Sequence, residues 1–125
     1  MDSEKLSILI VEDDEGIVEL LKAKLEESGY AISVAMDGIT AIDMAIQLDP
    51  DLIILDVMLP HLDGFGVCAE LKLDRGTSKI PILMCTAQNS LADIEKGFSF
   101  GINGYIIKPF DFEKVLVKIK QILGK

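Results

Sequence analysis

The chain has 125 residues, 50% of them hydrophobic, and 12 basic against 21 acidic side chains give a formal net charge of −9. This length fits one domain with a sizeable core, and the hydrophobic content excludes a disordered class. The acidic charge argues against direct nucleic-acid binding, and no apolar stretch approaches the roughly 18 residues of a membrane span.

Strand and helix patterns alternate through the first half of the chain. The apolar runs Leu6–Val11 and Ala31–Ala35 predict two strands. Each run is followed by apolar side chains at helical spacing, which end at Ser28-Gly29 and at Asp49-Pro50 respectively. The two helical stripes consist of Ile17, Val18, Leu21 and Leu25, and of Ala41, Ile42, Ala45 and Ile46.

The second half continues the alternation. Leu52–Leu55 predicts a strand buried on both faces that ends at Asp56, and further strands are predicted at Ile80–Cys85 and around Tyr105–Ile107. The helix at about residues 90–98 has few apolar positions, so we expect it to be the most mobile. The other two helices carry Phe65, Cys68 and Leu71, and Phe112, Val115, Leu116, Ile119, Ile122 and Leu123, the latter with Asp111 as its N-cap.

Five strands alternating with five helices predict an α/β fold. Its sheet should be parallel, doubly wound and covered by helices on both faces, because parallel neighbours need crossover connections. No repeat or linker interrupts the pattern, so we expect a single domain over residues 1–125, with residues 1–5 as a short polar lead-in and no output domain. That lead-in lacks the apolar core of a signal peptide, and we expect a cytoplasmic protein.

Ligands of such sheets lie beyond the carboxyl ends of the strands. A carboxylate at the end of a buried strand is unfavourable unless its charge is used, so Asp56 is the leading candidate for a reactive group. Crowded carboxylates repel one another, and a hard divalent cation such as Mg²⁺ relieves this repulsion. The polar residues at the predicted strand ends are Glu12, Asp13, Asp14, Asp56, Thr86 and Lys108.

These residues resemble the response-regulator receiver domain of two-component signalling, over essentially the whole chain. The matching motifs are the Glu12-Asp13 pair, Asp56 to Pro60 with Asp63-Gly64, Thr86-Ala87, Tyr105 and Lys108-Pro109. The resemblance implies a flavodoxin-like sheet with strand order 2-1-3-4-5, as in chemotaxis receivers. In that order the first and third strands are neighbours, which would bring the acidic pair beside the acceptor aspartate.

The resemblance also implies a reaction. Asp56 would accept a phosphoryl group from the phosphohistidine of a histidine kinase or phosphotransfer protein. Mg²⁺, or Mn²⁺, would be held by Asp13, Asp56 and the backbone carbonyl of Met58, with Glu12 acting mostly through water. Lys108 would supply positive charge in a cis Lys108–Pro109 peptide, with Pro109 as a brace.

The remaining motif residues are implied to sense the reaction or to tune it. The Thr86 hydroxyl would bond the phosphoryl group and Tyr105 would turn inward, which switches a partner-binding surface. Pro60, Asp63 and Gly64 would shape the loop after Asp56. Met58 and Gln88 would tune phosphoryl loss, and a methionine at position 58 predicts slow self-dephosphorylation. The chain would catalyse its own phosphorylation and slow dephosphorylation while serving mainly as a signalling switch.

Structural interpretations compete with these roles. Thr86 alone is typical of a strand end, Tyr105 of a half-buried aromatic, and Asp14 of a first helical turn. His61, the only histidine, is interpreted as a solvent-facing loop residue outside the site. Both cysteines, Cys68 and Cys85, are interpreted as core side chains.

Two other functions remain as alternatives. One is a receiver-like interaction module that phosphorylation does not control, and the other is a Mg²⁺-dependent phosphatase with an aspartate nucleophile. The phosphatase is disfavoured because Met58 stands where that chemistry needs a second aspartate. Asn103-Gly104 before Tyr105 departs from receivers that dimerise as transcription factors. We therefore expect a monomer or a phosphorylation-dependent dimer that acts on an unknown downstream protein or a fused effector.

Overall fold

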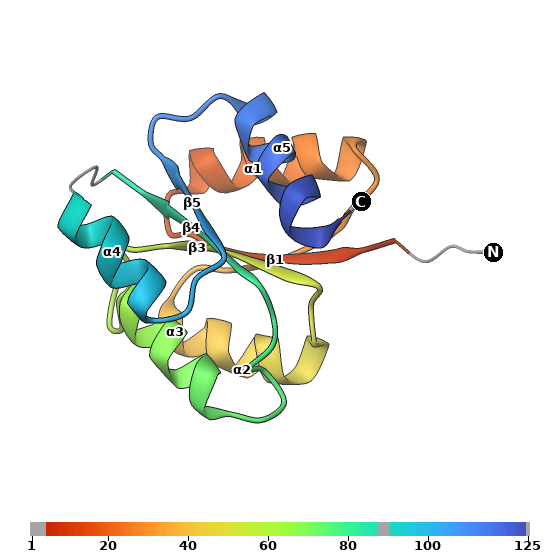
Figure 1. Cartoon of the computed structure of the whole chain (residues 1–125). Coiled ribbons are helices and arrows are strands. Elements are labelled where there is room, and N and C mark those ends of the chain that lie inside the picture. The colour runs from red at the N-terminus through yellow and green to blue at the C-terminus, as the bar shows by residue number, and fades with distance from the viewer. Residues whose placement is uncertain (1–4, 88–90, 125) are drawn as a thin grey trace.

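One parallel sheet forms the centre of the computed structural model, which describes residues 5–87 and 91–124. Within these residues five strands follow the order β2-β1-β3-β4-β5, as predicted. The doubly wound arrangement places the central strands between two layers of helices (Figure 1). The strands are β1 (Ser7–Val11), β2 (Ala31–Ala35), β3 (Leu52–Asp56), β4 (Ile82–Thr86) and β5 (Gly104–Ile107).

Helices cover both faces of this sheet. They are α1 (Glu15–Glu27), α2 (Gly38–Leu48), α3 (Gly64–Leu73), α4 (Leu91–Ser99) and α5 (Phe112–Leu123). In Figure 1, α1 and α5 lie on one face, and α2, α3 and α4 lie on the other. No helix of the described residues combines the length and apolar character that a membrane span requires.

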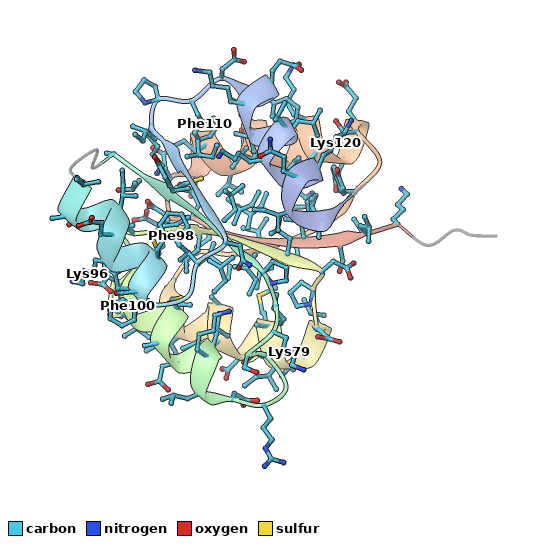
Figure 2. The ribbon with its side chains drawn as sticks, in the orientation of Figure 1. Lys79, Lys96, Phe98, Phe100, Phe110 and Lys120 are labelled. Carbon is cyan, nitrogen blue, oxygen red and sulfur yellow. The ribbon has the colours of Figure 1, made fainter. Side chains whose placement is uncertain are left out.

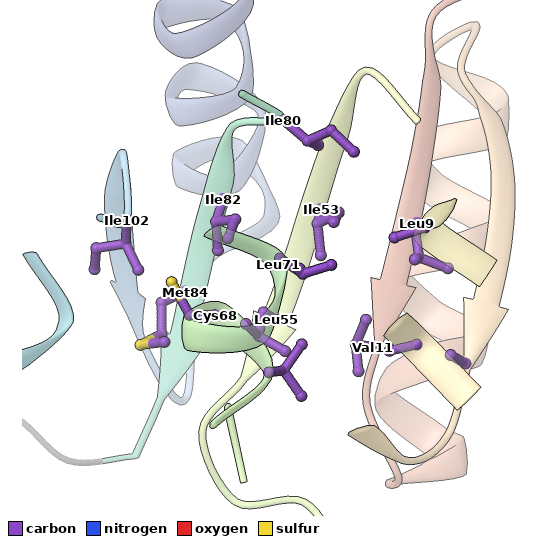
Figure 3. Close-up of a cluster of buried hydrophobic side chains, with 14 of the residues drawn as sticks. Leu9, Val11, Ile53, Leu55, Cys68, Leu71, Ile80, Ile82, Met84 and Ile102 are labelled. Carbon is purple, nitrogen blue, oxygen red and sulfur yellow. The ribbon is translucent and has the colours of Figure 1, made fainter. Parts of the chain in front are cut away.

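Alternate residues of the central strands face the two helical layers. Leu9, Ile53 and Ile82 belong to the buried cluster against α2 and α3, together with Cys68 (Figure 3). Strand residues on the opposite face of the sheet, such as Ile10 and Cys85, belong to the cluster against α1 and α5. Burial on both faces explains why these strands are continuously apolar in sequence. It also confirms that both cysteines are buried, as predicted.

Aspartates cap four of the described helices. The side chains of Asp14, Asp37, Asp63 and Asp111 accept hydrogen bonds from backbone N–H groups in the first turns of α1, α2, α3 and α5. The predicted cap at Asp111 is therefore confirmed. Asp14, which the sequence places in the first turn, lies just before it as the cap.

Some predicted boundaries were wrong by one or two residues. The fourth strand begins at Ile82 rather than Ile80, since Pro81 has no N–H for the sheet. It extends to Thr86, which therefore lies within the strand. The first strand begins at Ser7 rather than Leu6, and the third includes Asp56. In α4 only Gly97 is buried, and the predicted start at residue 90 lies outside the described residues.

Candidate functional site

Three carboxylates meet at the carboxyl end of the sheet. Val11 pairs with Leu55 in the β1–β3 register, so the residues that follow the two strands emerge side by side. Oxygen atoms of Glu12, Asp13 and Asp56 all lie within 4.8 Å of one another. Glu12 and Asp56 are only 3% and 4% exposed, whereas Asp13 is exposed to solvent. Two of the three charges are therefore largely removed from water.

The ammonium group of Lys108 compensates part of this negative charge. Its Nζ lies 2.8 Å from Glu12 Oε1 and 3.2 Å from Asp56 Oδ1. The lysine follows β5, and its backbone N–H donates to the Thr86 carbonyl at 2.8 Å, which ties it to the end of β4. The Lys108–Pro109 peptide is cis, as the resemblance implied. The pairing with Glu12 was not predicted.

This arrangement changes the acidity of both partners. Burial, and then the charge of Glu12, raises the pKa of Asp56 to about 6, although Lys108 and the Met58 backbone N–H act to lower it. Burial alone would lower the pKa of Lys108, but the hydrogen bond to Glu12 and the nearby Asp56 charge outweigh it and raise that pKa. Asp56 is thus mostly ionised at neutral pH, and its buried charge lowers the free energy of unfolding.

The residues present fit a hard divalent cation. Carboxylate oxygens are the ligands that Mg²⁺ prefers, and the acidic group exceeds the single ammonium in charge. Because Asp13 is exposed, an ion can reach the three carboxylates from solvent. The carboxylates of Glu12, Asp13 and Asp56 can therefore hold such an ion and the waters that accompany it.

Thr86 and Tyr105 lie beside one small cavity under α4. The cavity measures about 30 Å³, and Val57 and Phe65 also line it. Thr86 is buried and Tyr105 half-buried. The Tyr105 ring packs edge-on against Phe98 of α4, with centroids 6.0 Å apart at 85°. Figure 2 shows Phe98 on the side of α4 that approaches the sheet. Sequence reasoning missed Phe98, whose only signal was its size on a mainly polar helix.

The loop of residues 57–63 connects Asp56 to α3. The Gly64 N–H donates to the Val57 carbonyl at 2.8 Å, and a side-chain carbon on Gly64 would lie 2.4 Å from the Asp56 carbonyl oxygen. Glycine is therefore required where α3 begins. Met58 is 63% exposed to solvent. His61 is exposed with φ at 71°, which agrees with its predicted place outside the site.

The structure brings most of the predicted site residues together. Glu12, Asp13, Asp56 and Lys108 form one cluster, and the Met58 backbone adjoins Asp56. Thr86 is connected to the cluster through the backbone of Lys108. Pro60 and Asp63 lie in the loop, and Pro109 follows the lysine. Gln88 lies outside the described residues.

Comparison with known proteins identifies relatives of the chain. The family model of the response regulator receiver domain matches residues 8–120. The DNA-binding dual master transcriptional regulator RpaA of Synechocystis is 46% identical over 118 residues, which are 94% of this chain and 49% of RpaA. The alkaline phosphatase synthesis transcriptional regulatory protein PhoP of Bacillus subtilis is 45% identical over 118 residues, which are 94% of this chain and 48% of PhoP. The chain thus spans about half the length of these two relatives.

Solved structures agree with these matches. The receiver domain of the sensor histidine kinase PA1611 of Pseudomonas aeruginosa PAO1, crystallised with a magnesium ion coordinated in the active site cleft, superposes with a TM-score of 0.90. It is 30% identical, and the alignment covers 98% of this chain and 100% of that one. A response regulator from Chloroflexus aurantiacus is 34% identical with a TM-score of 0.92, covering 98% and 100% of the two chains.

Proposed function

Because the chain belongs to the family of response regulator receiver domains, we propose that it takes a phosphoryl group onto Asp56 in a Mg²⁺-dependent reaction. One observation carries this proposal. Oxygens of Glu12, Asp13 and Asp56 converge within 4.8 Å, and the Lys108 ammonium contacts two of these three groups. This arrangement supports the proposal, because phosphoryl transfer requires a metal ion and a fixed positive charge beside the acceptor group.

The acidic group would hold the metal ion. Asp13 and Asp56 would bind it directly with the Met58 backbone carbonyl, and Glu12 would act mostly through water. The magnesium ion coordinated in the active site cleft of the PA1611 receiver supports a magnesium site in this chain. When bound, Mg²⁺ (or Mn²⁺) neutralises the carboxylates and the phosphoryl oxygens. Glu12 would then exchange part of its pairing with Lys108 for contact with a metal-bound water.

Asp56 is the nucleophile of the proposed reaction. A carboxylate oxygen attacks the phosphorus of a phosphohistidine on a histidine kinase or phosphotransfer protein. The new P–O bond forms as the P–N bond breaks, and the electron pair returns to the imidazole nitrogen. With the Asp56 pKa at about 6, most molecules carry the reactive carboxylate at neutral pH. The Lys108 ammonium, 3.2 Å from that carboxylate, stabilises the charge on the transferred group.

Thr86 and Tyr105 would convert the new phosphoryl group into a change of surface. The Thr86 hydroxyl would turn to donate to a phosphoryl oxygen, and Tyr105 would move inward toward the cavity that both residues line. Because Phe98 packs against Tyr105, this movement would alter the surface of α4, β5 and α5. The output would be a downstream protein or a fused effector, since transcriptional regulators are among the longer relatives.

Acetyl phosphate tests this proposal directly. Incubation with Mg²⁺ should add one phosphoryl group to the intact mass, and excess EDTA should prevent the gain. Asp56→Asn should abolish it, whereas Asp43→Asn, which changes an exposed aspartate of α2, should not. An unchanged mass of the wild-type protein would instead favour an interaction module that phosphorylation does not control.

A further inference from the structure

The loop of residues 57–63 contacts a glycine of another helix. Gly38 is the first residue of α2, and a side-chain carbon there would lie 2.4 Å from the Leu62 carbonyl oxygen and 2.8 Å from Val67 Cγ2. Non-bonded carbon and oxygen atoms do not approach this closely. The loop can therefore occupy its position only because residue 38 has no side chain.

A second glycine confines Leu62 from the side of α3. A side-chain carbon at Gly66 would lie 2.5 Å from Leu62 Cδ1. The Leu62 side chain also packs against the buried cluster on this face of the sheet. Both glycines lie in fixed backbone, because the Asp37 side chain caps α2 and the Asp63 side chain caps α3. Leu62 is thus held between the first turns of two helices.

The position of Leu62 constrains the part of the loop next to Asp56. Its N–H donates to the Pro60 carbonyl at 2.8 Å, which closes a tight turn with His61 at φ 71°. At the other end, Val57 donates to the Cys85 carbonyl at 3.2 Å and accepts from Gly64 at 2.8 Å. The backbone of Met58 lies within this short stretch. A shift at Leu62 must therefore be absorbed by the few residues that include Met58.

We propose that Gly38 and Gly66 are positioning residues for the metal site, because they seat Leu62 and thereby fix the backbone of Met58. This inference rests on the proposed function, in which the Met58 carbonyl binds Mg²⁺. Neither glycine belongs to the acidic cluster, and the nearest neighbours of Gly38 are Leu62 of the loop and Val67 of α3. Residues that orient metal ligands typically change metal affinity by about 10- to 100-fold when mutated.

The first test is Gly38→Ala. Calorimetry should give an Mg²⁺ dissociation constant about 10-fold higher than that of the wild type, the lower end of that range. Calorimetry is chosen because the chain contains no tryptophan whose fluorescence could report Mg²⁺ binding. Amide resonances of residues 57–63 should shift in the metal-free variant, while those of α5 stay in place. The matched control is Gly104→Ala, whose added carbon would meet side chains at ordinary distances of 3.4 and 3.5 Å.

A second pair of variants keeps the test independent of whether Gly38→Ala folds. Gly66→Ala should weaken Mg²⁺ binding because its methyl group meets the Leu62 side chain. In a Leu62→Ala background that side chain is gone, so adding Gly66→Ala should cause no further loss. A purely structural role would lower the free energy of unfolding but leave the Mg²⁺ affinity of the folded variants unchanged.

The outcomes separate this inference from the proposed function. A wild type that binds no Mg²⁺ would overturn both. A wild type that binds Mg²⁺ and is phosphorylated, with glycine variants of unchanged affinity, would overturn only the positioning role. Equal losses from Gly66→Ala with and without Leu62→Ala would also overturn it.

Discussion

Replacing Asp56 with asparagine should stabilise the metal-free protein at alkaline pH. Burial and the Glu12 charge raise the pKa of Asp56 from 3.8 to about 6, so the folded state binds this proton more tightly than the unfolded state. The resulting stabilisation is fully present below about pH 3.8 and is lost as the pH rises through about 6. The difference between a pKa of 3.8 and one of about 6 corresponds to about 3 kcal/mol of unfolding free energy.

The asparagine substitution removes this cost but also removes one partner of Lys108. Lys108 keeps its contact with Glu12 at 2.8 Å, so its charge remains paired. The net gain at pH 8 should therefore be about 1–3 kcal/mol, with the full pKa difference as the upper bound. At pH 5 the folded wild type carries the proton on Asp56 but the unfolded chain does not, so about half of this cost remains and the gain from Asp56→Asn should be roughly half of that at pH 8.

Urea unfolding followed by far-ultraviolet circular dichroism, in EDTA at pH 5 and pH 8, measures this difference. Asp43→Asn controls for the loss of one negative charge at an exposed position and should change stability by less than about 0.5 kcal/mol. Saturating Mg²⁺ at pH 8 should stabilise the wild type and have little effect on Asp56→Asn. The reasoning fails if Asp56→Asn is no more stable than the wild type at pH 8, or if its gain is the same at both pH values.

Three further predictions concern single side chains. Lys108→Ala should slow phosphorylation by acetyl phosphate by about 10²–10³-fold, measured as the rate of mass gain. Lys114→Ala, at an exposed position of α5, should leave that rate unchanged. Met58→Asn should speed loss of the phosphoryl group, because an amide can orient an attacking water and the exposed Met58 side chain cannot; unchanged decay of the phosphorylated form would contradict this. Burial raises the pKa of Cys85 to about 12, so its thiol should react with Ellman's reagent at pH 8 only after urea unfolding. Rapid reaction of Cys85 in the native protein, distinguished from Cys68 by peptide mapping of the labelled chain, would refute that assignment.

The sequence was most informative where chemistry is local. The continuous apolar run Leu52–Leu55 predicts a strand buried on both faces, and all residues of β3 are buried in the structure. Asp111 predicts a helix cap, and its side chain accepts a hydrogen bond from the Glu113 N–H in the first turn of α5. The order of the strands required more than periodicity. It followed from the resemblance, which rests on motifs at several strand ends, and the order then brought Glu12 and Asp13 beside Asp56.

Contacts between distant residues were not predictable from pattern. Glu12 and Lys108 are 96 residues apart, and nothing in either motif indicates that Lys108 lies closer to Glu12 than to Asp56. The pair Asp37-Gly38 is typical of a turn in sequence, whereas Gly38 begins α2 and contacts Leu62. The requirement for glycine arises from the approach of a loop far along the chain. Such a requirement becomes visible only when both segments are placed in three dimensions.

The unfavourable burial of Asp56 and its proposed reactivity have the same physical origin. A carboxylate that is 4% exposed, beside a second buried acid, gains from any cation that approaches it. Lys108 offsets only part of the unfavourable burial of charge, because its single ammonium group contacts two carboxylates. A well-packed apolar side chain in place of Asp56 would stabilise the fold but would remove both the proposed metal ligand and the proposed nucleophile. The fold therefore keeps a destabilising charge at the one place where the proposed reaction would use it.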